Sequence, residues 1–204
     1  MSQGGKIAVA AGIGALVFLM VVAAAAAALV TLLTGGLFTP AEGEPVKQSA
    51  TVSEVTCEVA GGIHGGSLDL DAAQAGNAAV IHQVAVDSAL PAQASVIALA
   101  AAMQESGLRD LNYGDRDSLG LFQQRPSQGW GTPAQIMNPA YAATQFYRHL
   151  QRVPGWWQMP LWKAANAVQR SAYPTAYEKW QSKATSLARF LDAHPHACSR
   201  TQLG

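Results

Sequence analysis

The feature that most constrains this chain is an uncharged stretch near its N-terminus. No Asp, Glu, Lys, Arg or His occurs between Lys6 and Glu42, and residues 7–33 are almost entirely apolar. As a helix this stretch would be about 40 Å long, more than the roughly 30 Å hydrocarbon core of a bilayer. We therefore expect residues 1–36 to form an N-terminal transmembrane anchor that contacts the membrane through residues 7–33.

A cleaved secretory signal is the alternative for this segment. The apolar region of such signals spans only about 7–15 residues, so its length here favours the anchor. Lys6 precedes the stretch, whereas Glu42 and Glu44 follow it. The positive-inside rule then predicts a single-pass membrane protein with a cytoplasmic N-terminus and an extracytoplasmic C-terminal domain. If the segment is cleaved, the domain is secreted.

The rest of the chain divides into a linker and one globular domain. Residues 37–66 are rich in Gly, Pro, Ser, Thr and Glu, which predicts a flexible linker. From residue 67 to 204 the apolar residues repeat at helical spacing, which predicts the globular domain. A possible strand lies before it, around residues 51–59. We expect an all-α fold, with helices from Asp69 or Asp71 to about Ser88 and over about 91–107, 138–150, 160–171 and 174–191. The last helix has a repeat at helical spacing that predicts a core-facing side, formed by Tyr177, Trp180, Ala184, Leu187 and Leu191.

The only two cysteines, Cys57 and Cys198, lie near the two ends of the predicted domain. In an extracytoplasmic protein this arrangement predicts a disulfide between them. Two unpaired thiols are the alternative. Two cysteines are too few for a cysteine-only zinc site.

Composition excludes several function classes. The chain has 13 basic and 13 acidic residues, so its formal net charge is zero. A neutral chain without basic runs gives no reason to expect a nucleic-acid partner. The five histidines show no metal-ligand spacing. We therefore predict neither a metal site nor a cofactor.

Glu105 is the candidate catalytic residue. It closes an Ala- and Val-rich helix and is followed by Ser106 and Gly107. Partial burial at such a helix end would raise the pKa of the carboxyl group towards the working pH, as cleavage of a glycosidic bond by a general acid requires. The alternative is an exposed Glu that pairs with Arg109 one helical turn later.

Three motifs around Glu105 resemble the lysozyme-like lytic transglycosylases, the superfamily of soluble lytic transglycosylases and goose-type lysozymes. The first is Glu105-Ser106. The second is Gly120-Leu121-Phe122-Gln123, with Phe122 in place of the usual Met and Gln123 following Glu105 by 18 positions. The third is the helix that Asn138-Pro139 opens. The resemblance covers about residues 91–177 and implies a lysozyme-like helical domain that cleaves peptidoglycan.

The same resemblance implies a glycan-binding groove. Hydrogen bonds to the sugars are expected from the polar side chains of the motifs and of a later helix, with Tyr113 lining the groove; the polar set is Ser118, Gln123, Gln124 and Gln169. The family often has Ala-Tyr-Asn where this chain has Ala167-Val168-Gln169, so its Tyr is missing; Tyr173 is a possible substitute. Loop aromatics, including Trp130, are further candidates for packing against sugar faces.

The resemblance implies that a single Glu cleaves the β-1,4 bond between N-acetylmuramic acid and N-acetylglucosamine, with the substrate's own hydroxyl closing an anhydro ring. A hydrolytic muramidase would need a second carboxylate. Asp110, Asp115 and Asp117 could supply it, although loop capping is the commoner role for such residues. A non-catalytic peptidoglycan-binding module of an envelope-spanning secretion or conjugation apparatus and a purely structural anchor remain alternatives.

Overall fold

The computed structural model describes residues 53–194 and 197–202, which belong to one folded unit. The predicted membrane anchor, residues 7–33, and the linker up to residue 52 lie outside the described residues. Within the described ranges, no helix is long and apolar enough to cross a membrane.

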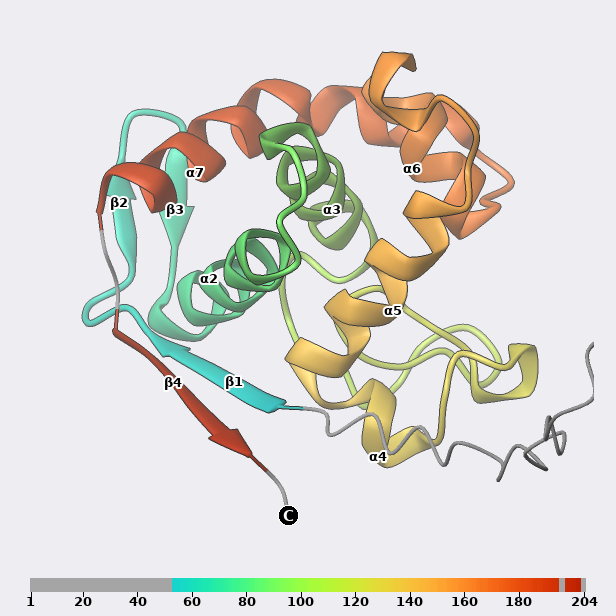
Figure 1. Ribbon diagram of the computed structural model, residues 1–204, viewed down its shortest axis with the longest axis horizontal. Helices are drawn as coiled ribbons and strands as arrows, with labels where there is room; N and C mark the ends of the chain where they lie inside the picture. The colour runs from blue at the N-terminus through green and yellow to red at the C-terminus, as the bar shows by residue number, and fades with distance from the viewer. Residues whose placement is uncertain (1–52, 195–196, 203–204) are drawn as a thin grey trace, which may run out of the picture. The chain divides into compact units, whose positions relative to one another are not determined.

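Helices form most of the folded unit, and four short strands flank them (Figure 1). The α-helices are α2 (Ala72–Asp87), α3 (Ala92–Glu105), α4 (Pro133–Ile136), α5 (Pro139–Gln151), α6 (Leu161–Gln169) and α7 (Gln181–Ala193). The 3₁₀ helices are η1 (Pro126–Gln128), η2 (Trp156–Gln158) and η3 (Pro174–Trp180). The strands are β1 (Ser53–Glu58), β2 (Ile63–Gly65), β3 (Leu68–Leu70) and β4 (Ala197–Gln202).

The core is built around α3. Every residue from Ala94 to Met103 is buried, and the helix packs against α2, α5, α6, α7 and η3 (Figure 1). A helix that is apolar on all sides is stable only when other elements enclose it. Small alanine side chains let those neighbours approach closely. The last residue of this enclosed helix is Glu105, so the core fixes the position of the candidate acid.

The prediction of an all-α fold is wrong. Two antiparallel two-stranded sheets are present: β1 pairs with β4, and β2 pairs with β3. The strands are only three to six residues long, too short for a clear alternating pattern in the sequence. The partners β1 and β4 also lie near opposite ends of the sequence of the folded unit, so no local sequence signal predicts that they pair.

The β2–β3 hairpin lies where the sequence predicted the end of the linker. Gly65 ends β2 and Gly66 begins the two-residue turn, with φ values of +135° and +59°, conformations that glycine adopts at little cost. Ile63, Leu68 and Leu70 bury their side chains in the core. The folded unit therefore begins before residue 67, and these glycines belong to a hairpin rather than to the tether.

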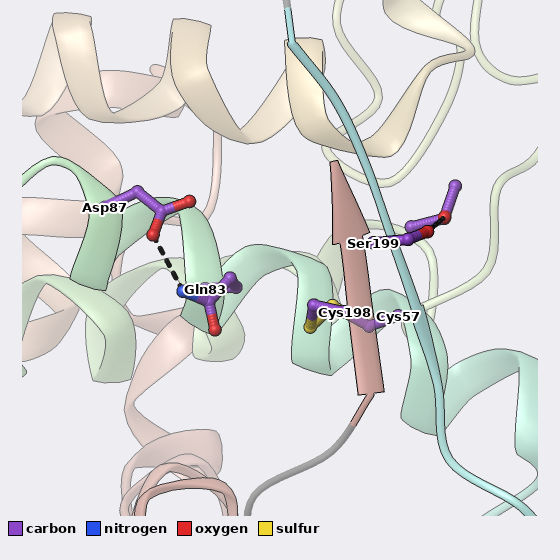
Figure 2. The surroundings of a disulfide bond; sticks show 6 residues. Cys57, Gln83, Asp87, Cys198 and Ser199 are labelled. Carbon is purple, nitrogen blue, oxygen red and sulfur yellow. Dashed lines mark hydrogen bonds between the residues drawn. A yellow bond between two sulfur atoms is a disulfide. The ribbon is translucent and has the colours of Figure 1, made fainter. Parts of the chain in front are cut away.

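The predicted disulfide joins Cys57 of β1 to Cys198 of β4 (Figure 2). The two residues are directly opposite in the ladder, and Thr56 Oγ1 lies 2.8 Å from Ser199 Oγ in the adjacent pair. Since β1 packs against α2 and α5, the covalent bond fastens β4 to the helical core through β1.

Most of the predicted helices are present, and capping residues explain where two of them begin. The Asp71 side chain accepts from the Gln74 N–H at the start of α2, and Asn138 does the same for Tyr141 at the start of α5. The helix predicted over 174–191 is instead the 3₁₀ helix η3 followed by α7. Its expected apolar face is nonetheless in the core, where Tyr177 is fully buried.

Candidate active site

Glu105 lies in a cleft of about 590 Å³. The end of α3, the loops between α3 and α4, one face of α5 and the end of α6 form its walls. The lining residues are Glu105, Asp115, Ser118, Gln123, Gln124, Arg125, Gln128, Trp130, His149, Val168, Gln169, Arg170 and Ser171. A second hollow of about 430 Å³, between β1 and α2, contains mainly small apolar side chains and one carboxylate, Glu58. In the Glu105 cleft, by contrast, most of the lining side chains are polar or charged.

Ser106 fixes the turn that carries Glu105. Its hydroxyl donates to the Leu121 carbonyl oxygen at 2.8 Å and accepts from the Arg109 N–H at 3.2 Å. This contact joins the Glu-Ser motif to the Gly-Leu-Phe-Gln motif, which lies 15 positions later. Ser106 therefore positions the two motifs relative to each other and is not itself among the residues that line the cleft.

Helix α2 holds the same turn from the other side. The Gln74 side chain donates to the Gly107 carbonyl oxygen at 2.8 Å, and the Asn77 side chain donates to that of Leu108 at 2.9 Å. Gly107 and Leu108 both have positive φ, which directs the chain sharply away from α3. These two amides therefore pair with carbonyls of the turn that follows α3 and tie that turn to α2.

The Glu105 carboxyl is partly buried and accepts a hydrogen bond from Tyr177 Oη at 2.6 Å. Burial raises the pKa of Glu105 above its ordinary value, whereas hydrogen bonds from Tyr177 and Gln169 oppose that rise. The alternative pairing with Arg109 does not occur, because the Arg109 guanidinium binds Asp71 at 3.0 Å. Glu105 is thus a shielded carboxyl group in a cleft rather than a member of a surface ion pair.

Two of the predicted glutamines, Gln123 and Gln169, line the cleft from different elements. Gln169, in the last turn of α6, donates to the Phe122 carbonyl oxygen at 2.9 Å and also contacts Glu105. Gln123 has a positive φ of 47° and donates to the Tyr113 and Gly120 carbonyl oxygens, both at 3.3 Å. Both amides therefore have fixed orientations before any ligand binds.

Ser118 and Gln124 also line the cleft, but both are buried. The Gln124 amide nitrogen donates to the Ala142 carbonyl oxygen at 3.0 Å, which ties the loop to α5. Its Oε1 atom is buried and has no hydrogen-bond partner among the described residues. Tyr113 differs from the other predicted residues, since its side chain is 69% exposed and does not line the cleft. It contributes its backbone carbonyl to Gln123 instead.

The turn between Leu119 and Gln124 requires glycine at position 120. Gly120 has a φ of +72°, and a Cβ atom there would lie 2.6 Å from the Ile136 carbonyl oxygen. The adjacent Leu119 and Gln124 form an isolated antiparallel bridge that closes the turn. Any larger residue at position 120 would therefore displace the segment that carries Gln123.

The three aspartates considered as a second carboxylate have different surroundings. Asp117 binds Arg125 at 2.6 Å and the Ser127 N–H at 2.8 Å, and these bonds hold the pKa of Asp117 well below its usual range. Burial raises the pKa of Asp110 to about 6, but Asp110 does not line the cleft. Of the three aspartates, only Asp115 lines the cleft. Its ion pair with Arg116 is long, at 3.9 Å.

Sequence reasoning missed Tyr177 as a site residue, although it predicted its burial. The hydroxyl of Tyr177 contacts Glu105 although 72 residues separate the two. The missing Tyr of the Ala-Tyr-Asn stretch was the available signal, because it implied that another residue fills this place. Tyr173, the substitute considered, is 78% exposed.

Sequence reasoning also missed His149 and Arg170. The His149 ring stacks face to face on Trp130 with centroids 4.1 Å apart, and both residues line the cleft. Arg170 follows the last residue of α6 and lines the cleft beside Gln169. Among the residues with described positions, no group of three His, Cys, Asp or Glu side chains is placed to hold a metal ion.

Comparison of the chain with protein-family models and with curated proteins found no match. The function must therefore be argued from the residues of the cleft.

Proposed function

We propose that this protein is a lytic transglycosylase that cleaves the β-1,4 bond between N-acetylmuramic acid and N-acetylglucosamine in peptidoglycan. The observation that carries the proposal is the Glu105 carboxyl group, which lies in a polar cleft with a pKa raised by burial. A carboxylic acid that retains its proton near neutral pH can donate it to the leaving oxygen of a glycoside.

Glu105 performs both proton transfers of the proposed reaction. The protonated carboxyl donates its proton to the glycosidic oxygen as the bond to the anomeric carbon breaks. The resulting carboxylate then takes the proton of the sugar's own C6 hydroxyl, whose oxygen bonds to the anomeric carbon and closes the anhydro ring. The acid is restored, and no water is consumed. Tyr177 Oη donates to Glu105 at 2.6 Å and so stabilises the carboxylate between the two transfers.

The surroundings of Glu105 suit an extended glycan. Gln123 and Gln169 both place side-chain amides in the lining, and the stacked Trp130–His149 pair offers an aromatic face for a sugar ring. The Cys57–Cys198 disulfide supports an extracytoplasmic location, where peptidoglycan lies, because such bonds persist in oxidising compartments.

Product analysis tests the proposal. Full-length protein, purified in detergent, is incubated with peptidoglycan beside its Glu105→Gln variant and a Glu178→Gln control, a Glu on η3 that does not line the cleft. We expect anhydro-muropeptides by mass spectrometry, retained release by the control, and a loss of about 10²-fold or more for Glu105→Gln.

Other products would favour the alternatives. Reducing ends from the wild type would indicate a hydrolytic muramidase, for which Asp115 is the candidate second carboxylate because it lines the same cleft. Binding without release from any version would indicate a non-catalytic peptidoglycan-binding module. Equal release by wild type and Glu105→Gln would refute the role of Glu105.

A further inference from the structure

The charged groups in the cleft are not balanced at one end. Arg125, one of the two guanidinium groups in the lining, is committed to Asp117 at 2.6 Å and to the Ser127 hydroxyl at 3.1 Å. The other is Arg170, and no carboxylate pairs with it within the described ranges. The nearby Arg152 likewise has no ion-pair partner among those residues. The end of the cleft formed by α6 and α5 therefore carries uncompensated positive charge.

Arg170 also has a backbone conformation that is unusual for a residue with a side chain. Arg170 is the C-terminal cap of α6, with φ and ψ of +55° and +40°, and its N–H donates to the Asn166 carbonyl oxygen at 2.8 Å. This left-handed position is the one for which glycine is the favoured residue, and a side chain there introduces strain. Gln169, the preceding residue, contacts Glu105. Arg170 therefore directly follows, in the sequence, a residue that contacts the candidate acid Glu105.

The wall beside Arg170 is aromatic. Trp130 and His149 stack with an interplanar angle of 22°, and both line the cleft with Arg170. Burial lowers the pKa of His149, and the charges of Arg152 and Arg170 lower it further. The ring is therefore neutral at pH 7, and the guanidinium supplies the positive charge next to a flat apolar face.

We propose that Arg170 binds a carboxylate carried by the glycan, so that the cleft selects strands with anionic substituents over neutral glycans. This inference rests on the proposed function and identifies its substrate class more closely. A guanidinium presents parallel N–H groups that match the two oxygens of a carboxylate. The sugar that carries the carboxylate packs on the Trp130–His149 wall. In peptide-bearing strands this carboxylate belongs to the stem, because the lactyl carboxyl group of muramic acid is bonded to the stem as an amide.

Affinity measurements on the inactive protein test the inference. Full-length protein carrying Glu105→Gln is titrated calorimetrically with soluble peptide-bearing glycan fragments and with the same fragments after their carboxylates are converted to carboxamides. Arg170→Gln is the variant. Arg148→Gln is the matched control, since Arg148 is an exposed residue of α5 that does not line the cleft. Arg170→Gly is a second variant that suits the left-handed backbone and keeps the test independent of misfolding.

We expect both Arg170 variants to bind the native fragments about tenfold more weakly than the control, as loss of a charge-assisted hydrogen bond implies. The carboxamide fragments should bind all versions equally and should show weaker salt dependence. Fragments stripped of their stems by an amidase carry a newly freed lactyl carboxylate instead. Loss of the preference for the Arg170 protein with these fragments shows that Arg170 requires the stem carboxylate, and a retained preference shows that Arg170 also accepts the lactyl carboxylate.

Equal affinity of Arg170→Gly and Arg148→Gln for native fragments would overturn the inference, as would a tenfold difference that persists with the carboxamide fragments. Neither result affects the proposed function, which the wild-type release of anhydro products tests separately. Failure of folded Glu105→Gln protein to bind any fragment, together with no release by wild type, would overturn both.

Discussion

Tyr177→Phe removes one atom, and that atom contacts the proposed acid. The Tyr177 hydroxyl donates to Glu105 Oε1 at 2.6 Å, and a hydrogen bond to a charged group contributes about 1.5–3 kcal/mol. Because this bond favours the ionised carboxylate, it keeps the pKa of Glu105 below the value that burial alone would impose. About 1.4 kcal/mol corresponds to a tenfold change in a protonation equilibrium. Without the hydroxyl, Glu105 should hold its proton to higher pH.

The pH dependence of kcat/KM measures this effect. The alkaline limb of the profile reports loss of the proton from the essential acid in the free enzyme. From the hydrogen-bond energy above, we expect the limb to move to higher pH by about one to two pH units in Tyr177→Phe. The assay is the release of soluble fragments from peptidoglycan between about pH 4 and 9, a range chosen to bracket a raised carboxyl pKa.

Tyr147→Phe is the matched control. Tyr147 is also a buried tyrosine, but its hydroxyl donates to the Ile81 carbonyl oxygen at 2.9 Å and does not touch Glu105. This variant should lose stability without moving the alkaline limb. An unmoved limb in Tyr177→Phe, or one displaced to lower pH, would refute the assignment of Glu105 as an acid whose proton affinity Tyr177 sets.

Two further predictions concern stability. Burial raises the pKa of Asp110 to about 6 in the folded protein, against an ordinary value of 3.8, so the folded state binds more protons between these values and stability falls as pH rises through that window. Asp110→Asn should remove this fall, so that urea unfolding at pH 4 and pH 7 shows the variant gaining on the wild type only at pH 7; an equal gain at both would contradict the pKa. Replacing Cys57 and Cys198 together with Ala should lower the free energy of unfolding by about 2–5 kcal/mol, since the bond closes a 141-residue separation. Unchanged urea unfolding under non-reducing conditions would contradict that stabilisation.

The parts of the fold that sequence reasoning predicted are those decided within a few neighbouring residues. The Asn138 cap of α5 depends on its own side chain and on the Tyr141 N–H three positions later, with Pro139 between them. The C-terminal end of α3 similarly depends on Gly107, whose positive φ few other residues adopt. Such helix ends can be predicted from neighbouring residues alone, without knowledge of the rest of the chain.

Strand β1 lies within the possible strand around residues 51–59, but β2, β3 and β4 were missed because their partner is distant or because their composition is ambiguous. β4 becomes a strand only by pairing with β1, and the Cys57–Cys198 prediction contained that proximity without being used to infer a ladder. In β2 and β3, Gly65 and Gly66 have the composition of a tether as well as that of a hairpin turn. What distinguishes the two is burial of Ile63 and Leu70, a property of the tertiary structure.

The candidate site follows the same division. The spacing of the motifs predicted that Glu105 and Gln123 lie in one cleft, and the comparison with a later helix of the family added Gln169. All three residues line the cleft. Tyr177 was assigned to the core on its helical spacing, and its ring is indeed buried. Hydrophobic periodicity predicts that a tyrosine ring faces the core, but it does not predict which group the tyrosine hydroxyl contacts. A tyrosine can therefore satisfy a core position and serve a carboxyl group at once, and only the packing of η3 against α3 reveals the second role.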